Sequence, residues 1–210
     1  MTVLGVLNQI NGRDKTARFF QYLCRLLDYI TARNTASDRY KFLEYQLGTF
    51  RKLLRFGRSL ESFYLASKNI HNADVLSRLA GLAKIAHGCY LFCDHFLLMK
   101  RLQLLQLNSN AWASSANKYW LLAIILNLIH NYYELKKVWR VYKKNNNDSL
   151  SILSHVQIYF SLYVDLIRNC CDIFIPLYAL NYVQLSSGLI GLFGMLSSIA
   201  GLITLIANQK

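Results

Sequence analysis

Apolar and polar residues follow one another along this chain with the period of an α-helix. Apolar side chains recur three and four positions apart almost throughout, and strand-like alternation is absent. A single proline, Pro176, interrupts the 210 residues, so few positions force a helix to end. The pattern predicts an all-α protein.

Three helices are expected in the N-terminal half. The first runs from Asp14 to Ala32 and is amphipathic, the second from Arg39 to Lys68, and the third from Val75 to Leu107. Polar breaks with good capping residues separate them at Thr35 to Asp38 and at Asn69 to Asp74. The third helix is apolar nearly all round.

The second of these helices separates apolar and basic side chains onto opposite faces. At about 100° per residue, one broad arc is apolar and consists of Phe42, Leu43, Tyr45, Leu47, Phe50, Leu53, Leu54, Phe56, Leu60, Phe63 and Tyr64. The opposite arc carries Arg51, Lys52, Arg55 and Arg58. Such a helix suits the plane of a bilayer interface, with the apolar residues in lipid and the basic residues at the head groups. The same pattern also suits a helix of a protein bundle.

One segment is long and apolar enough to cross a bilayer. Leu185 to Ala207 holds 23 residues without a charge, which makes a helix of about 34 Å. The uncharged run Tyr119 to Ile129 is much shorter, below the roughly 20 residues that a bilayer core requires. Lys143 to Ser149, with three successive asparagines, is expected to be a loop.

Small residues form a narrow stripe within this C-terminal span. Ser187, Gly191, Gly194, Ser198 and Gly201 are spaced four, three, four and three residues apart, so they share one helix face. Small side chains let helix backbones approach closely in lipid. We expect the stripe to serve self-association or packing within the chain.

Composition favours a membrane protein over a nucleic-acid-binding one. The chain is 54% hydrophobic, above the roughly 45 to 50% of soluble domains. Its net charge of +13 suits nucleic acid or an anionic lipid surface, but no uninterrupted basic tail is present. The five cysteines show no paired CxxC spacing, and we expect reduced thiols. The first ten residues lack a basic start, so no cleavable signal peptide is expected.

No group of residues indicates catalysis or a cofactor. His87, Cys89, Cys93 and His95 are of the types that bind zinc, but on a helix they point in diverging directions, so no metal site is expected. Phosphate-loop, nucleophile-elbow and HExxH motifs are absent. We therefore expect a protein that is not an enzyme.

Charged residues near the C-terminal span have two interpretations. Asp165, Arg168 and Asp172 lie three and four residues apart. They fit mutual ion pairing on one helix flank, or a path for protons or solutes through the membrane.

Several strings, in their order and spacing, resemble the peroxin-11 family of peroxisomal biogenesis factors. They are GRDKTARFFQYLCRLLDYI, FRKLLRFGRSLESF, DVLSRLAGLAKIAHGCYLFCDHFLL, NKYWLLAIILNLIHNYYEL, and DLIRNCCDIFIPLYAL followed by GLIGLFGMLSSIAGLITLI. Together they cover nearly the whole chain.

The resemblance implies a peroxisomal membrane protein that elongates and divides the organelle. It implies an N-terminal region facing the cytosol, a remodelling helix at Arg39 to Lys68, self-association, and recruitment of a dynamin-type fission GTPase with its membrane adaptors. Anionic phospholipid is the expected membrane partner.

The expected organisation has two regions. Residues 1–110 form a cytosol-facing amphipathic helical region, and residues 111–210 a membrane-embedded region with its span near 185–207. The basic cluster Lys136 to Lys144 would face the organelle lumen if two spans were present and both ends were cytosolic, against the usual positive-inside bias. An adaptor that recruits fission machinery without bending lipid, and a solute channel, are the alternative functions.

Overall fold

The computed structural model describes residues 5, 8–31, 36–72, 74–144 and 159–207, and every regular element among them is an α-helix. In chain order these are α2 (Ile10–Ile30), α3 (Ala36–Leu54), α4 (Arg58–Ile70), α5 (Val75–Arg101), α6 (Ser109–Lys144), α8 (Phe160–Asp172), α9 (Phe174–Ala179) and α10 (Ser187–Ala207). The predicted all-α fold is confirmed, and α10 is long and apolar enough to span a membrane.

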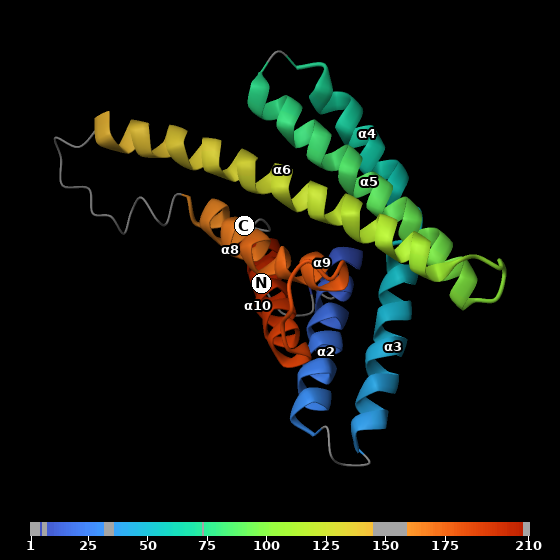
Figure 1. The fold of residues 1–210 in the computed structure, drawn as a ribbon. Helices are drawn as coiled ribbons and strands as arrows, with labels where there is room; N and C mark the ends of the chain where they lie inside the picture. The colour runs from blue at the N-terminus through green and yellow to red at the C-terminus, as the bar shows by residue number, and fades with distance from the viewer. Residues whose placement is uncertain (1–4, 6–7, 32–35, 73, 145–158, 208–210) are drawn as a thin grey trace.

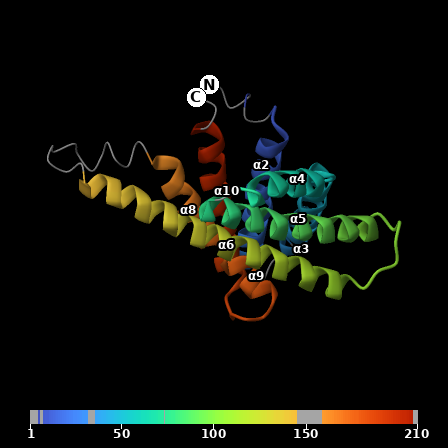
Figure 2. The ribbon, with the colours of Figure 1, turned by 90° about the horizontal axis from the view of Figure 1, so that it is seen from above.

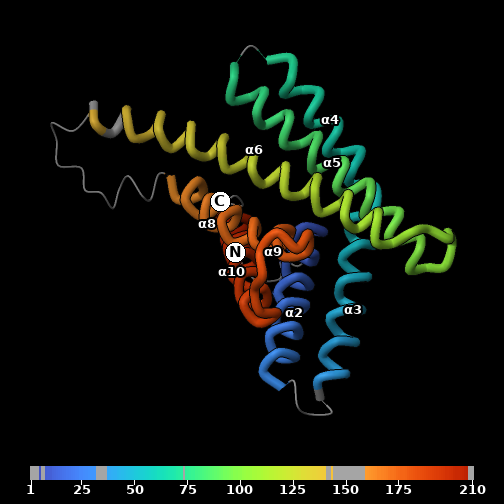
Figure 3. The backbone as a smooth tube through the Cα atoms, viewed as in Figure 1, coloured from blue at the N-terminus to red at the C-terminus, as the bar shows by residue number. Residues whose placement is uncertain are grey.

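Long neighbouring helices pack in pairs, as Figures 1 and 3 show. α2 and α3 form one hairpin and α4 and α5 another, while α6 runs along α5 and α10 runs along α2. α8 and α9 lie against α6 and α10. Because α10 packs on α2, the two predicted regions, 1–110 and 111–210, share an extensive helix interface.

The single helix predicted from Arg39 to Lys68 is wrong. α3 ends at Leu54 and α4 begins at Arg58, with Gly57 between them at a φ of 79°. Glycine adopts this left-handed conformation readily because it has no Cβ. His95 of α5 stabilises the turn, since the Gly57 amide donates a hydrogen bond to its Nε2 at 3.1 Å. The break turns α4 so that it lies along α5.

Helix α6 is much longer than the apolar run Tyr119 to Ile129 that it contains. α6 extends over 36 residues because neither glycine nor proline occurs between Ser109 and Lys144. Asn108 begins it, since its side-chain oxygen accepts hydrogen bonds from the amides of Asn110 and Ala111. Its C-terminal end projects beyond the other helices in Figures 1 and 2. Of the loop predicted at Lys143 to Ser149, residues 145–149 lie outside the described residues.

The small-residue stripe of α10 packs within the chain. A Cβ on Gly191 would lie 3.0 Å from the Leu26 amide nitrogen, and one on Gly194 would overlap the Tyr22 ring. Gly201 faces the Lys15 side chain, and Ser198 is buried with its hydroxyl donating to the Gly194 carbonyl. Of the two roles expected for the stripe, which begins at the partly exposed Ser187, the structure shows packing within the chain, since Gly191 and Gly194 lie against α2; self-association stays a prediction.

Large apolar side chains remain exposed on every long helix. They include Phe20 of α2, Phe92 of α5 and Leu122 of α6, and on α10 a row of leucines and isoleucines at Leu189, Leu192, Leu196, Ile199, Ile203 and Ile206. Exposed apolar surface of this extent marks a site of membrane or protein contact. The fold therefore places its main apolar surface outward, as expected for a protein whose neighbour is lipid.

Candidate functional site

The candidate site is formed by α3 and α4, whose apolar side chains point away from the rest of the protein. Phe42 is 61% exposed, Leu53 49% and Leu60 74%. We call the exposed members of the predicted apolar arc, on α3, the connecting turn and α4, the apolar flank; they are Phe42, Leu43, Tyr45, Phe50, Leu53, Phe56, Leu60, Phe63 and Tyr64. Leu47 and Leu54, the other two members of the predicted apolar arc, are half-buried.

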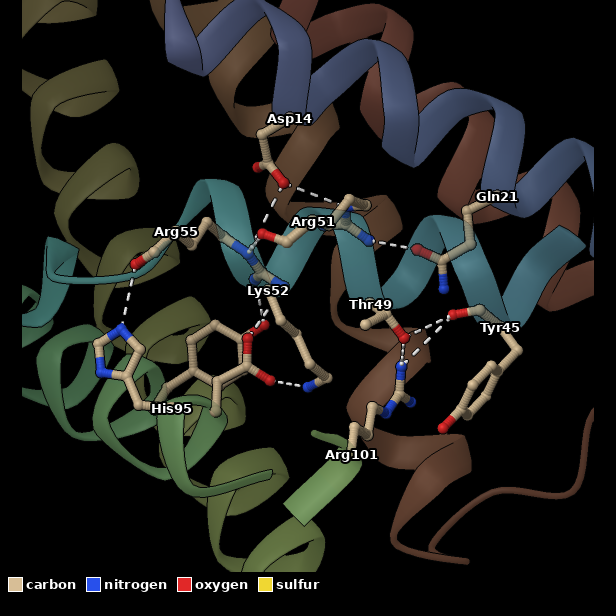
Figure 4. Close-up of polar contacts among 11 residues, drawn as sticks. Asp14, Gln21, Tyr45, Thr49, Arg51, Lys52, Arg55, His95 and Arg101 are labelled. Carbon is tan, nitrogen blue, oxygen red and sulfur yellow. Dashed lines mark hydrogen bonds and ion pairs between the residues drawn. The ribbon is translucent and has the colours of Figure 1, made fainter. Parts of the chain in front are cut away.

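The opposite face of α3 points into the protein and carries a buried ionic cluster (Figure 4). We define the ionic cluster as Asp14, Arg51, Lys52, Arg55 and Asp94. Arg51 and Arg55 are each only 9% exposed. The two carboxylates come from other helices, Asp14 from α2 and Asp94 from α5.

Each basic side chain of the cluster has a carboxylate partner. Arg51 Nε lies 3.1 Å and Arg55 Nε 3.6 Å from Asp14 Oδ1. On the other side Arg55 Nη2 lies 3.0 Å from Asp94 Oδ2, and Lys52 Nζ pairs with Asp94 Oδ1. Arg55 thus bridges α2 and α5 through α3, and its position within the chain is fixed by both neighbours.

Further polar contacts surround the cluster. Arg51 donates to the Gln21 side chain at 2.7 Å and Arg55 to the Tyr90 hydroxyl at 2.6 Å. Arg101 donates to Thr49 at 2.7 Å, and its guanidinium lies over the Tyr45 ring (Figure 4). These hydrogen bonds satisfy donors that burial removes from water.

These contacts correct the assignment of lipid head-group contacts to α3. Arg51, Lys52 and Arg55 lie inside the protein, because carboxylates on α2 and α5 attract them there. Arg58, the fourth assigned residue, lies 3.7 Å from Glu61 on α4. The apolar arc lies outward as an interfacial helix requires, whereas the basic arc faces protein.

The cluster shifts the ionisation of the groups that it encloses. Burial alone would raise the pKa of the Asp14 carboxyl, but Arg51, Arg55 and Arg18 together hold that pKa below its ordinary value. Burial, aided by Lys84, Arg58 and Arg55, lowers the pKa of His87 to about 3, so this imidazole is neutral. The Asp14 shift reflects the positive charge between α2 and α3, whereas the His87 shift is caused mainly by burial.

A second buried ion pair joins α2 to α8. Arg18 of α2 pairs with Asp172 of α8, and both side chains are buried. Arg168 instead pairs with Asp165 at 2.9 Å. The interpretation of Asp165, Arg168 and Asp172 as mutually paired therefore holds for the first two residues only.

The residues considered for zinc have other contacts. His87 Nδ1 lies 3.3 Å from the Ser62 hydroxyl, and His95 Nε2 lies 3.1 Å from both the Gly57 amide nitrogen and the Arg55 carbonyl oxygen. Cys89 and Cys93 are free thiols. In the described part of the chain, no three His, Cys, Asp or Glu side chains converge as metal ligands.

The sequence interpretation missed the two carboxylates that organise the site. Asp94 interrupts the nearly all-apolar stretch of α5, and an acid in such a setting requires a cationic partner. That requirement, combined with the basic arc of α3, was the signal that could have identified the pairing. Asp14, in the first turns of α2, carried no comparable signal because its surroundings in sequence are polar.

Comparison with known proteins gives concordant matches over the whole chain. The model of the family described as peroxisomal biogenesis factor 11 (PEX11) matches residues 2–206. Peroxisomal membrane protein 11A of Rattus norvegicus is 29% identical, over 97% of this chain and 95% of that protein. Peroxisomal membrane protein 11B of Homo sapiens is 27% identical, over 94% of this chain and 93% of that protein. No solved structure matches the chain significantly.

Proposed function

This chain belongs to the peroxisomal biogenesis factor 11 family, and we propose that it bends the peroxisomal membrane by inserting its apolar flank into one leaflet. Family membership establishes a peroxisomal membrane protein with a role in peroxisome biogenesis. Curvature, elongation and fission of the organelle are the mechanism that we propose for that role.

One observation carries the proposal: the apolar flank of α3 and α4 is exposed while the ionic face of α3 is buried. An apolar side chain that enters the interface gains about 1 kcal/mol, below the 1.5 to 3 of complete burial. The nine side chains of the flank together favour insertion by about 9 kcal/mol on this scale. Exposure to water would forfeit that free energy.

Insertion into one leaflet only is what generates curvature. Two helices of 19 and 13 residues that lie among the head groups expand the leaflet that holds them and leave the other unchanged. We propose that the flank enters the cytosolic leaflet, with the N-terminal region on the cytosolic side.

We propose that contact with anionic phospholipid falls to α6 instead of α3. Lys136, Lys137 and Arg140 are exposed near its projecting end, together with Tyr133 and Trp139. Basic and aromatic side chains in one segment are typical of the membrane–water interface. We call Lys136, Lys137 and Arg140 the basic end of α6.

Elongation and division of an organelle need many inserted helices at one place. We propose that the protein forms homo-oligomers, which concentrate the inserted flanks, and that a dynamin-type fission GTPase with its membrane adaptors acts on the narrowed membrane. This role requires no catalytic chemistry from the chain itself.

Reconstitution into vesicles tests the proposal. Full-length protein is incorporated into phosphatidylcholine vesicles with one-fifth phosphatidylserine, and tubulation is scored by electron microscopy. Leu53→Glu with Leu60→Glu should abolish tubulation, since it places two charges on the flank. The matched control, Lys41→Gln with Asn72→Glu, makes the same change in net charge at exposed polar positions outside the flank and should still tubulate.

Two results would count against the insertion mechanism. Wild-type protein that leaves vesicles spherical but captures fission factors would show an adaptor. Tubulation by the Leu53 and Leu60 double variant would show that another surface bends the membrane.

A further inference from the structure

A polar cavity of about 470 Å³ lies between α2, α3, α5, α6 and α8. Its size falls within the range of small-molecule sites, roughly 300 to 1,000 Å³. The ionic cluster forms one wall, and the Arg18–Asp172 pair forms another. Neither the proposed insertion of the apolar flank nor the basic end of α6 uses this space.

The lining of the cavity carries a large excess of positive charge. Eight lysine or arginine side chains line it against three aspartates, an excess of five. Cations held close together in a poorly solvated space repel one another, so such an arrangement is costly unless an anion compensates it.

Two of these cations retain unused capacity to bind an anion. Lys15 forms no ion pair or hydrogen bond with any of the described residues, and its ammonium lies against Gly201, in a helix that carries no charge. Arg18 is buried, and its guanidinium uses both Nη atoms on Asp172 while Nε has no partner among the described residues. A buried, unpaired donor of this kind is uncommon.

We propose that this cavity binds a phosphate-bearing anion through Lys15 and Arg18, with Arg51 and Arg168 contributing positive charge. Arginine and lysine together are the usual protein ligands of phosphate, arginine through its planar donor fork and lysine as a point charge. The phosphate belongs either to a soluble phosphorylated molecule or to the head group of a phospholipid; both present the same chemistry to these side chains.

The ionisation of Lys15 gives the site a dependence on pH. Burial and the nearby Arg168 and Arg18 lower its pKa to about 8, and Asp14 and Asp172 offset only part of this effect. These four groups come from α2 and α8, Arg51 of α3 lines the same cavity, and α10 brings no charge. An anion stabilises the charged ammonium, so binding takes up a proton and weakens as the pH rises through about 8.

The test uses full-length protein in a phospholipid-free maltoside detergent with inorganic pyrophosphate as the probe. Bound pyrophosphate is measured by equilibrium dialysis at fixed ionic strength, at pH 7 and at pH 9. Lys15→Gln is the informative variant because it removes a charge that has no carboxylate partner, so folding should persist. Lys15→Arg retains the charge, and Lys118→Gln removes an exposed lysine of α6 outside the cavity lining as the matched control.

We expect saturable binding that is at least about tenfold weaker in Lys15→Gln, weaker at pH 9 than at pH 7, and unchanged in Lys118→Gln. Lys15→Arg should restore it at both pH values. A second arm adds phosphatidic acid in neutral vesicles as a competitor: displacement of pyrophosphate identifies a head-group site, and no displacement identifies a soluble ligand. Absence of saturable binding in both arms, or equal affinity of the wild type and Lys15→Gln, would overturn the proposal.

Discussion

Two segments of this chain carry the same basic spacing and lie in opposite environments. Arg51, Lys52 and Arg55 occupy positions i, i+1 and i+4 in α3, and Lys136, Lys137 and Arg140 occupy the same positions in α6. The first three belong to the ionic cluster in the interior, whereas the second three are exposed. The local pattern therefore does not determine which side of a helix faces protein.

Carboxylates on neighbouring helices make the difference. Asp14 and Asp94 lie 37 residues before Arg51 and 42 after Lys52, and both pack against α3. The basic end of α6 forms no ion pair within the described part of the chain. A basic arc is drawn inward where distant acids meet it, and it stays outward where none do.

The largest effect should follow from removing the inward cations. Arg51→Ala with Arg55→Ala leaves Asp14 unpaired and Asp94 with Lys52 alone, so we expect a loss of about 3 to 5 kcal/mol in the free energy of unfolding. The matched variant, Lys136→Ala with Arg140→Ala, should change it by no more than about 0.5 kcal/mol. Denaturant titration in detergent micelles, followed by circular dichroism, measures both. Equal stability of the two variants would contradict the difference between the segments.

For lipid binding we expect the opposite order: Lys136→Ala with Arg140→Ala should have a larger effect than Arg51→Ala with Arg55→Ala. Each exposed basic residue near an anionic surface contributes about 1 kcal/mol, so Lys136→Ala with Arg140→Ala should weaken binding to anionic vesicles by about thirtyfold. Flotation of vesicles with and without phosphatidylserine measures this. Measurement at high salt is the control, because screening should remove the difference between the wild type and this variant. A loss that salt leaves unchanged would argue against a head-group contact.

Substitutions of two glycines near the ionic cluster test the break between α3 and α4, and their expected effects on stability are smaller. Gly57→Ala should cost about 1 kcal/mol or somewhat more, because alanine disfavours the φ of 79° at the turn. Gly48→Ala lies within α3, where the added methyl meets only the ends of the Gln21 and Arg101 side chains at 3.4 Å or more. It should be neutral or stabilise by up to about 1 kcal/mol. The same unfolding titration compares them, and an equal cost for both would show that the turn is not required.

The smallest expected effect is a loss of stability at acidic pH. The pKa of Asp14 is held below its ordinary value of 3.8, so its contribution to stability is present above pH 4 and lost as the pH falls through its folded-state pKa. Wild-type protein should therefore lose stability between pH 5 and pH 3, and Asp14→Asn should lose less over the same range. Asp38→Asn, on the same hairpin, serves as the control and should follow the wild type.

Helical content and the positions of most helices could be predicted from the chain alone, because period and breaks are local properties. The break at Gly57 could not, since a lone glycine inside a helical pattern is usually tolerated and only packing of α4 on α5 explains the turn. The apolar run Tyr119 to Ile129 does not indicate the full length of α6, which depends on the absence of glycine and proline between Ser109 and Lys144.

Only the apolar half of the site could be predicted from the sequence. The apolar members of the arc, such as Phe42 and Leu60, lie outward because none of the described residues covers them, which the sequence indicated through their shared face. The destination of Arg51 and Arg55 depends on residues brought together only by the fold. For the same reason the sequence alone does not show whether the glycines of α10 pack against another copy of the protein or against α2. The contact between Tyr22 and Gly194 identifies α2.

Direct identification of the neighbour of the apolar flank tests the central claim. A benzophenone amino acid is placed at Leu53 or Leu60 in full-length protein on peroxisomal membranes, with the exposed Lys41 of α3 as the polar control position, and products are analysed by mass spectrometry after irradiation. The account predicts adducts with phospholipid acyl chains at Leu53 and Leu60 and far fewer at Lys41. Adducts only with protein, at both Leu53 and Leu60, would contradict it.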